Sequence, residues 1–108
     1  MIEYTEGYFS YYVYILTNSH RNTFYIGVTN NLPRRLSEHQ NKSNPNSFTA
    51  RYSLFYLVYY EKYSWIQLAI EREKELKKWN RTKKIDLIRS FNSDFEFLND
   101  RFQQNLIG

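Results

Sequence analysis

The stretch of sequence that decides the fold runs from residue 11 to residue 29 and reads YYVYILTNSHRNTFYIGVT. Residues 11–17 and 24–29 are rich in aromatic and β-branched side chains, which favour strands. The polar residues 18–23 separate them. The stretch therefore predicts a β-hairpin with a longish loop.

Strand alternation assigns the two faces of this hairpin. Successive side chains of a strand point to opposite faces, so Tyr12, Tyr14 and Leu16 share one face of the first strand. On the second strand, Tyr25 and Gly27 share a face. Because Gly27 has no Cβ, we expect it to leave room for a ligand or a tyrosine hydroxyl to approach the strand.

A short helix follows the hairpin. Residues 30–33, Asn-Asn-Leu-Pro, are typical of a helix start, with asparagine as the cap and proline in the first turn. Helical spacing predicts that Leu32 and Leu36 are buried. Arg35 and His39, four residues apart, should project together from an adjacent stripe.

The rest of the chain predicts one more strand and further helical segments. Turn residues at 41–47 close the first helix, and residues 55–63 form a third strand. A short basic helix spans residues 83–90, and a last turn is expected at 94–98. We expect little order from Asn99 onward.

The longest predicted helix covers about residues 65–79. Ser64 with Gln67 three residues later is a capping box that would open it. Glu73 lies beside the apolar stripe of this helix, where a carboxylate is unusual unless it has a specific structural or functional role. The expected stripe consists of Trp65, Leu68, Ala69, Arg72, Leu76 and Trp79.

Length and composition exclude several classes of protein. A chain of 108 residues with 42% hydrophobic and 19% aromatic residues is typical of one globular domain. The absence of cysteine excludes disulfides, cysteine-ligated metal and thiol nucleophiles, and fits a reducing compartment. No apolar run approaches the roughly 18 residues that span a bilayer, and no signal peptide opens the chain, so we expect a cytoplasmic protein.

Excess positive charge is concentrated in one segment. The net charge is +1 over residues 1–71, +5 over residues 72–89 and −2 over residues 90–108. A basic surface around a flat tryptophan suits a phosphate backbone, but a charge run is as often a solvated helix face with internal ion pairs. The candidate nucleic-acid-binding residues are Lys74, Lys77, Lys78, Arg81, Lys83 and Lys84, with Trp79 among them.

Familiar catalytic motifs are missing, and a different set of residues remains. The chain has no G-x-S-x-G motif, no phosphate-binding G-x-x-x-x-G-K loop and only two histidines, His20 and His39. We expect His20, in the hairpin loop, to be a solvated side chain. The remaining candidates around the hairpin and the helices are Tyr14, Tyr25, Arg35, His39 and Glu73.

With these residues the sequence resembles the GIY-YIG nuclease superfamily. The signature of that family is two tripeptides on adjacent strands about ten residues apart, matched here by Tyr-Val-Tyr at 12–14 and Tyr-Ile-Gly at 25–27. An arginine eight residues past the second glycine matches Arg35. A glutamate in an Ala-x-x-x-Glu-x-x-Leu context matches Glu73.

The resemblance covers about residues 11–90 and is strongest to the small stand-alone, single-domain members of the family. Their pattern Arg-Glu-Lys-x-Leu-Lys-Lys-Trp is found at residues 72–79. We therefore expect a GIY-YIG-like domain at 11–90, an N-terminal extension at 1–10, and a C-terminal tail at 91–108 that is partly helical or disordered. The implied fold class is α+β, a small three-stranded antiparallel sheet flanked by helices.

The resemblance also implies an activity, the cleavage of nucleic-acid phosphodiester bonds. Glu73 would hold one divalent cation, Mg²⁺ or Mn²⁺, and Arg35 would bind the scissile phosphate. Tyr14 or Tyr25 would orient or deprotonate the attacking water, and the sequence leaves open which of them does. His39 would contact the phosphate or share the proton transfer.

Departures from the family pattern keep other functions open. Tyr12 stands where the first glycine of the family signature would be, and Val28 stands where some branches place a polar or basic residue. Glu73 is also spaced for an ordinary ion pair with Lys77. With no attached DNA-reading domain expected, a metal-dependent endonuclease of low sequence specificity, acting on branched or damaged DNA, is the main hypothesis. A non-cleaving nucleic-acid-binding module and a protein-interaction scaffold are the alternatives.

Overall fold

The predicted hairpin forms the centre of an antiparallel sheet. In the computed structural model, which describes residues 10–102, β1 (Tyr11–Thr17) pairs with β2 (Phe24–Thr29) on one side and with β3 (Tyr56–Tyr63) on the other. The strand order is β2-β1-β3. The predicted α+β class with a three-stranded antiparallel sheet is confirmed.

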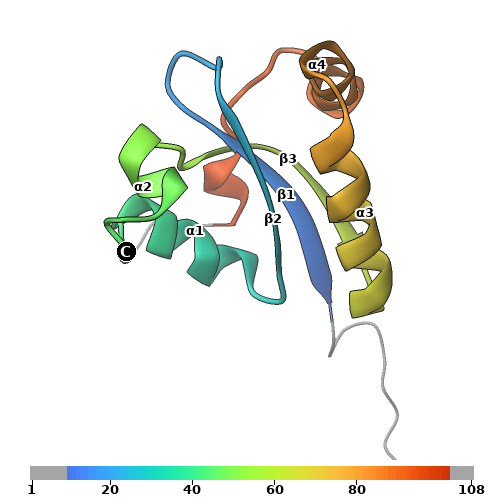
Figure 1. Ribbon diagram of the computed structural model, residues 1–108, viewed down its shortest axis with the longest axis horizontal. Coiled ribbons are helices and arrows are strands. Elements are labelled where there is room, and N and C mark those ends of the chain that lie inside the picture. The colour runs from blue at the N-terminus through green and yellow to red at the C-terminus, as the bar shows by residue number, and fades with distance from the viewer. Residues whose placement is uncertain (1–9, 103–108) are drawn as a thin grey trace, which may run out of the picture.

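Helices cover both faces of this sheet (Figure 1). α1 (Leu32–Gln40) and α2 (Phe48–Tyr52) lie on one side, and α3 (Ile66–Lys78) and α4 (Arg81–Phe91) lie on the other. Two separate cores result, because alternate residues of β1 point to opposite faces. The α1 side buries Tyr14, Leu16, Leu32, Leu36, Leu54, Leu57 and Leu98, and the α3 side buries Val13, Ile15, Ile26, Val58, Tyr59, Ala69, Leu76, Ile88 and Phe95.

The first helix forms as the sequence predicts. The Asn31 side chain accepts a hydrogen bond from the backbone N–H of Arg34, as expected of a cap. Leu32 and Leu36 are fully buried against the sheet. This packing fixes the direction in which the next stripe of the helix, with Arg35 and His39, points.

The start of α3 differs from its prediction. The predicted capping box of Ser64 and Gln67 is wrong, because Trp65 is the cap residue and makes no side-chain capping bond. Ala69 and Leu76 are fully buried as predicted, but Trp65 and Leu68 are exposed. The stripe is narrow because the helix approaches the sheet through the small side chain of Ala69, which leaves the flanking side chains in solvent.

The chain after α4 is more ordered than the sequence suggests. α4 begins at Arg81 with Asn80 as its cap, earlier than predicted. The predicted turn at 94–98 is a turn over residues 92–95, and a 3-10 helix, η1 (Asn99–Arg101), follows. The expectation of little order from Asn99 is wrong for residues 99–102. The buried Asn99 amide oxygen accepts a bond from the N–H of Leu57, and its NH2 group donates to the carbonyl of Phe55.

Residues 1–9 and 103–108, which hold most of the expected extension and the end of the expected tail, lie outside the described residues.

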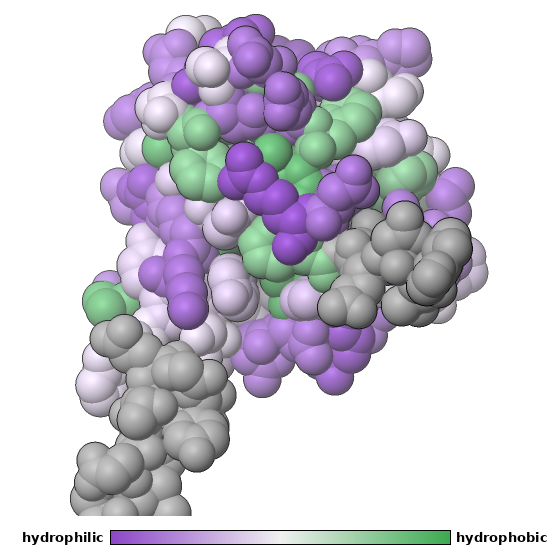
Figure 2. All heavy atoms as spheres, turned by 180° about the vertical axis from the view of Figure 1, so that it is seen from behind, coloured by the Kyte–Doolittle hydropathy of each residue, from purple (hydrophilic) through white to green (hydrophobic). Residues whose placement is uncertain are grey.

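Apolar patches on the back of the molecule lie among hydrophilic side chains (Figure 2). Within residues 10–102, no helix combines the length and the apolar character that crossing a membrane requires.

Candidate active site

Tyr14 and Gly27 lie directly opposite each other on β1 and β2. Tyr14 is fully buried, and a Cβ added to Gly27 would lie 2.5 Å from the Tyr14 hydroxyl oxygen. No side chain larger than hydrogen fits this position without moving the tyrosine. The expected role of Gly27, leaving room for a tyrosine hydroxyl, is confirmed.

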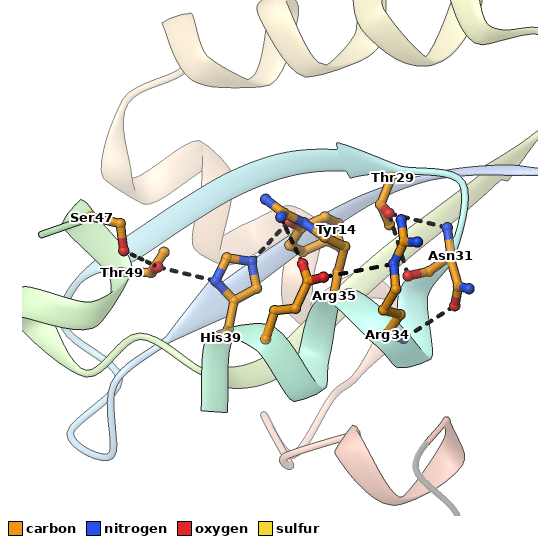
Figure 3. Close-up of polar contacts among 9 residues, drawn as sticks. Tyr14, Thr29, Asn31, Arg34, Arg35, His39, Ser47 and Thr49 are labelled. Atoms are coloured by element: carbon orange, nitrogen blue, oxygen red, sulfur yellow. Dashed lines mark hydrogen bonds and ion pairs between the residues drawn. The ribbon is translucent and has the colours of Figure 1, made fainter. Parts of the chain in front are cut away.

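A chain of side-chain hydrogen bonds runs from Tyr14 through α1 to α2 (Figure 3). The Tyr14 hydroxyl lies 3.0 Å from Nε2 of His39, and Nδ1 of His39 lies 3.0 Å from the Thr49 hydroxyl. The Thr49 hydroxyl is in turn 3.2 Å from the Ser47 hydroxyl. These bonds fix the imidazole from both sides, because each ring nitrogen has a partner.

The environment keeps this chain uncharged at neutral pH. Burial, with help from the nearby Arg35 charge, lowers the pKa of His39 to about 4. Burial and the neighbouring Tyr25 raise the pKa of Tyr14 to about 12, although Arg35 opposes the shift. The Tyr14 hydroxyl therefore stays protonated and can donate a hydrogen bond to Nε2 of the neutral imidazole. In this tautomer the Nδ1–H group of His39 donates to the Thr49 hydroxyl.

Arg35 lies beside this chain and lines an open pocket of about 250 Å³. Its guanidinium Nη1 donates to Glu38 Oε1 at 3.0 Å, and Glu38 is also 3.7 Å from Nε of Arg34. Tyr25 faces the same pocket, and its ring centroid lies 5.7 Å from that of His39. The pocket is lined by Tyr25, Arg35, Glu38, His39, Lys42, Ser43, Asn44, Ser47, Phe48 and Thr49.

The structure thus brings Tyr14, Tyr25, Arg35 and His39 together on the α1 side of the sheet. Glu73 lies on α3, which covers the opposite face, and its carboxylate pairs with Lys77 Nζ at 2.9 Å. No group of three potential metal-ligating side chains (His, Cys, Asp or Glu) occurs within the described part of the chain.

Helix geometry places Glu73 toward the β2 edge of the sheet. Arg72 and Glu73 flank the buried stripe of α3 on its two sides, because consecutive helical residues are about 100° apart. Arg72 pairs with Glu61 on β3. Glu73 therefore lies on the flank nearer β2, which is the strand that carries Tyr25.

The six candidate nucleic-acid-binding residues lie on α3 and α4, away from the pocket. Some of them have partners within the fold. Lys77 pairs with Glu73, Lys83 lies 4.3 Å from the Trp79 ring centroid, and Arg81 donates to the carbonyl of Asn22 at 2.7 Å. Lys74 and Lys78 are exposed, and Lys84 is half-buried.

Sequence reasoning missed the contribution of α2 to the site. Thr49 and Ser47 complete the hydrogen-bond chain, and Phe48 lines the pocket. The sequence signal for α2 was Ser47 at the end of a turn, because serine is a preferred cap residue. In the structure its side chain accepts a hydrogen bond from the N–H of Ala50. A helix of five residues shows no apolar periodicity that would have revealed it.

Comparisons with known proteins agree with this geometry. Residues 10–86 match the model of the GIY-YIG catalytic domain. A UPF0213 protein from Syntrophus aciditrophicus (strain SB) is 35% identical over 78 residues, which are 72% of this chain and 88% of that protein. The solution NMR structure of a UPF0213 protein from Bacillus halodurans superimposes with a TM-score of 0.53 at 25% identity, covering 88% of this chain and 99% of the other. The chain belongs to the GIY-YIG family, among the small stand-alone proteins of the UPF0213 group.

Proposed function

We propose that this protein is an endonuclease that hydrolyses phosphodiester bonds of nucleic acids, with DNA as the expected substrate and little sequence specificity. The observation that carries the proposal is the pocket itself. In a chain of a nuclease family, Tyr25, Arg35 and His39 line one open pocket, and Tyr14 is hydrogen-bonded behind His39.

Arg35 is the proposed phosphate-binding residue. Hydrolysis places additional negative charge on the phosphoryl oxygens, and a guanidinium offers a planar fork of donors to them. The ion pair with Glu38, which also lines the pocket, holds the Arg35 side chain before substrate binds. A phosphate entering there competes with Glu38 for the same donors.

Tyr25 and the pair of Tyr14 with His39 have different proposed roles. Tyr25 lines the pocket and orients the attacking water, whereas Tyr14 has no exposed surface and acts as a positioning residue through His39. A bound phosphate would offset the Arg35 charge that helps to lower the pKa of His39. Substrate binding would therefore make the neutral imidazole a better proton acceptor.

Glu73 is the proposed ligand of a divalent cation. Mg²⁺ is commonly held by one or two carboxylates together with waters and substrate phosphates, so a single carboxylate fits it. A bound cation would neutralise charge on the phosphoryl and leaving oxygens. Glu73 would first have to release Lys77, to which it is bound in this structure.

The test is cleavage of nicked, branched and plasmid DNA by the purified protein in Mg²⁺ or Mn²⁺. We expect Arg35→Ala to lower kcat about 10²- to 10³-fold, the size typical of losing a donor to transition-state charge. Arg34→Ala is the matched control, because Arg34 is the neighbouring arginine and shares Glu38 but does not line the pocket. Equal activity of the two variants would refute the proposed site.

One observation favours a second function, a nucleic-acid-binding module that does not cut. The Glu73–Lys77 ion pair occupies the proposed cation ligand. Lys77→Gln frees this carboxylate, so at saturating DNA an endonuclease should gain or keep cleavage at low Mn²⁺, while Glu73→Gln should lose it. Salt-sensitive DNA binding with no metal-dependent products in any variant would establish the non-cleaving module instead.

A further inference from the structure

Two exposed aromatic rings pack against each other on α2. Phe48 and Tyr52 are four residues apart on α2, and their ring centroids are 4.8 Å apart. Phe48 is 49% exposed and Tyr52 is 51% exposed. Of the two, Phe48 also lines the pocket that contains Arg35 and His39.

The helix that carries these rings is tied to the candidate active site. Thr49, the residue after Phe48, is buried and bonds to His39 through its hydroxyl. Ser47 caps the helix, and the N–H of Leu54 bonds back to the carbonyl of Thr49 at 2.8 Å. The inward face of α2 is therefore fixed to His39, and the outward face presents Phe48 and Tyr52 at a set position beside the pocket.

The surroundings of the two rings select the chemistry of a ligand. Arg35 and Lys42 line the same pocket as Phe48. A ligand that contacts both the two cationic side chains and the exposed rings must carry an anionic group next to a flat, apolar one. Two rings offer much less area than the roughly 1,000 Å² that a stable protein interface buries. A nucleotide has both required parts, and bases stack on exposed aromatic side chains without regard to sequence.

We propose that Phe48, supported by the Tyr52 ring tilted 47° against it, forms a stacking platform for an unpaired nucleobase that adjoins the phosphate bound at Arg35. This inference rests on the proposed function and names its substrate class, nucleic acid with single-stranded or unpaired residues. A base inside a duplex has both faces covered by its neighbours, so only an unstacked base can occupy the platform. DNA and RNA share this chemistry.

The experiment measures binding of short single strands and of matched duplexes, as DNA and as RNA, by fluorescence anisotropy in EDTA, which prevents cleavage. A 2-aminopurine in each strand reports stacking through quenching. We expect the single strand to bind more tightly than the duplex, and the double variant Phe48→Leu/Tyr52→Leu to weaken single-strand binding about tenfold and to remove the quenching. Leucine keeps the apolar character and removes the ring. Phe91→Leu is the matched control, since Phe91 is 43% exposed on α4.

The outcomes separate this inference from the proposed function. A double variant that binds single strands of both DNA and RNA as tightly as the wild type overturns the platform, as does an equal loss for single strand and duplex. If such a variant still cuts DNA in Mg²⁺ and Arg35→Ala does not, the endonuclease stands without the platform. Selective single-strand binding that depends on the two rings, in a protein that cuts nothing, supports the platform and refutes the endonuclease.

Discussion

Two tyrosine-containing hydrogen-bond networks lie on opposite faces of the sheet, and they differ in what surrounds them. On the α3 side, Glu61 binds the hydroxyls of Tyr59 and Tyr63 and both Nε and Nη2 of Arg72. Each Glu61 oxygen has at least two donors, so the network is closed. On the α1 side, the chain from Tyr14 through His39 to Thr49 adjoins Tyr25 and Arg35 at the pocket.

The comparison shows that a perturbed pKa does not by itself mark a functional site. Burial and Glu61 raise the pKa of Tyr63 to about 12, as burial and Tyr25 do for Tyr14. The Arg72 bond also lowers the pKa of Glu61 against the effect of burial. What distinguishes the two networks is that Arg35 and His39 line the pocket of the α1 side, whereas both oxygens of Glu61 are already bonded within the fold.

The largest expected effect is the loss of stability when the closed network around Glu61 is broken. Arg72→Met removes the charge partner of Glu61 and leaves a half-buried carboxylate with two tyrosines. We expect the free energy of unfolding to fall by about 3 kcal/mol, measured by urea denaturation, because one partner of a desolvated ion pair is left uncompensated. Lys74→Met on the exposed face of α3 should change it by less than about 0.5 kcal/mol. If DNA cleavage per folded Arg72→Met molecule fell as far as for Arg35→Ala, the α3 network would not be purely structural.

The next effect concerns Gly27, a single position where a substitution should lower both stability and DNA cleavage. Gly27→Ala places a methyl group against the Tyr14 ring, so Tyr14 must move away from His39. We expect a loss of about 2 kcal/mol in unfolding free energy, as for other overpacked cores, together with loss of cleavage. In a Tyr14→Leu background the same substitution should cost much less, because the clashing ring is gone. A cost equal in both backgrounds would show that the strain is in the backbone of β2 and not against Tyr14.

A third effect is the pH dependence of stability that His39 produces. The pKa of His39 is lowered to about 4 in the folded protein, so between about pH 4 and 6.5 the unfolded chain binds more protons. Stability from this group is complete above pH 6.5 and is lost as the pH falls toward 4. We expect about 1 to 2 kcal/mol less stability at pH 5 than at pH 7 from His39. This contribution should be absent in His39→Gln and unchanged in His20→Gln, and identical urea curves for the two variants at both pH values would contradict it.

The fold and half of the site follow from local patterns. The faces of β1 and β2, the Asn31 cap and the shared direction of Arg35 and His39 depend only on strand and helix periodicity. Tyr25 and Gly27 follow from the same alternation. These features were predictable because residues close in sequence determine them.

The remaining features depend on contacts between distant segments. The bond between His39 and Thr49 requires α2 to fold back on α1, and a five-residue helix has no periodicity that would predict this packing. Asn99 is ordered because its amide satisfies the backbone of residues 55 and 57 at the start of β3. For Glu73, the spacing fitted both a metal ligand and an ion pair with Lys77, and the fold forms the ion pair.

The smallest effect per residue concerns three lysines of α3 and α4, which lie on a different part of the surface from the pocket. Each lysine that contacts a phosphate of duplex DNA contributes roughly 0.9 to the slope of log affinity against log salt. If DNA lies across both faces through the β2 edge, Lys74→Gln, Lys78→Gln and Lys84→Gln should each reduce this slope by about that amount. Cleavage at saturating DNA should stay unchanged, because these residues lie away from Arg35. Lys42→Gln is the comparison at the pocket. If only Lys42→Gln lowers the slope, nucleic acid binds on the α1 side alone, and the basic helices are a solvated surface.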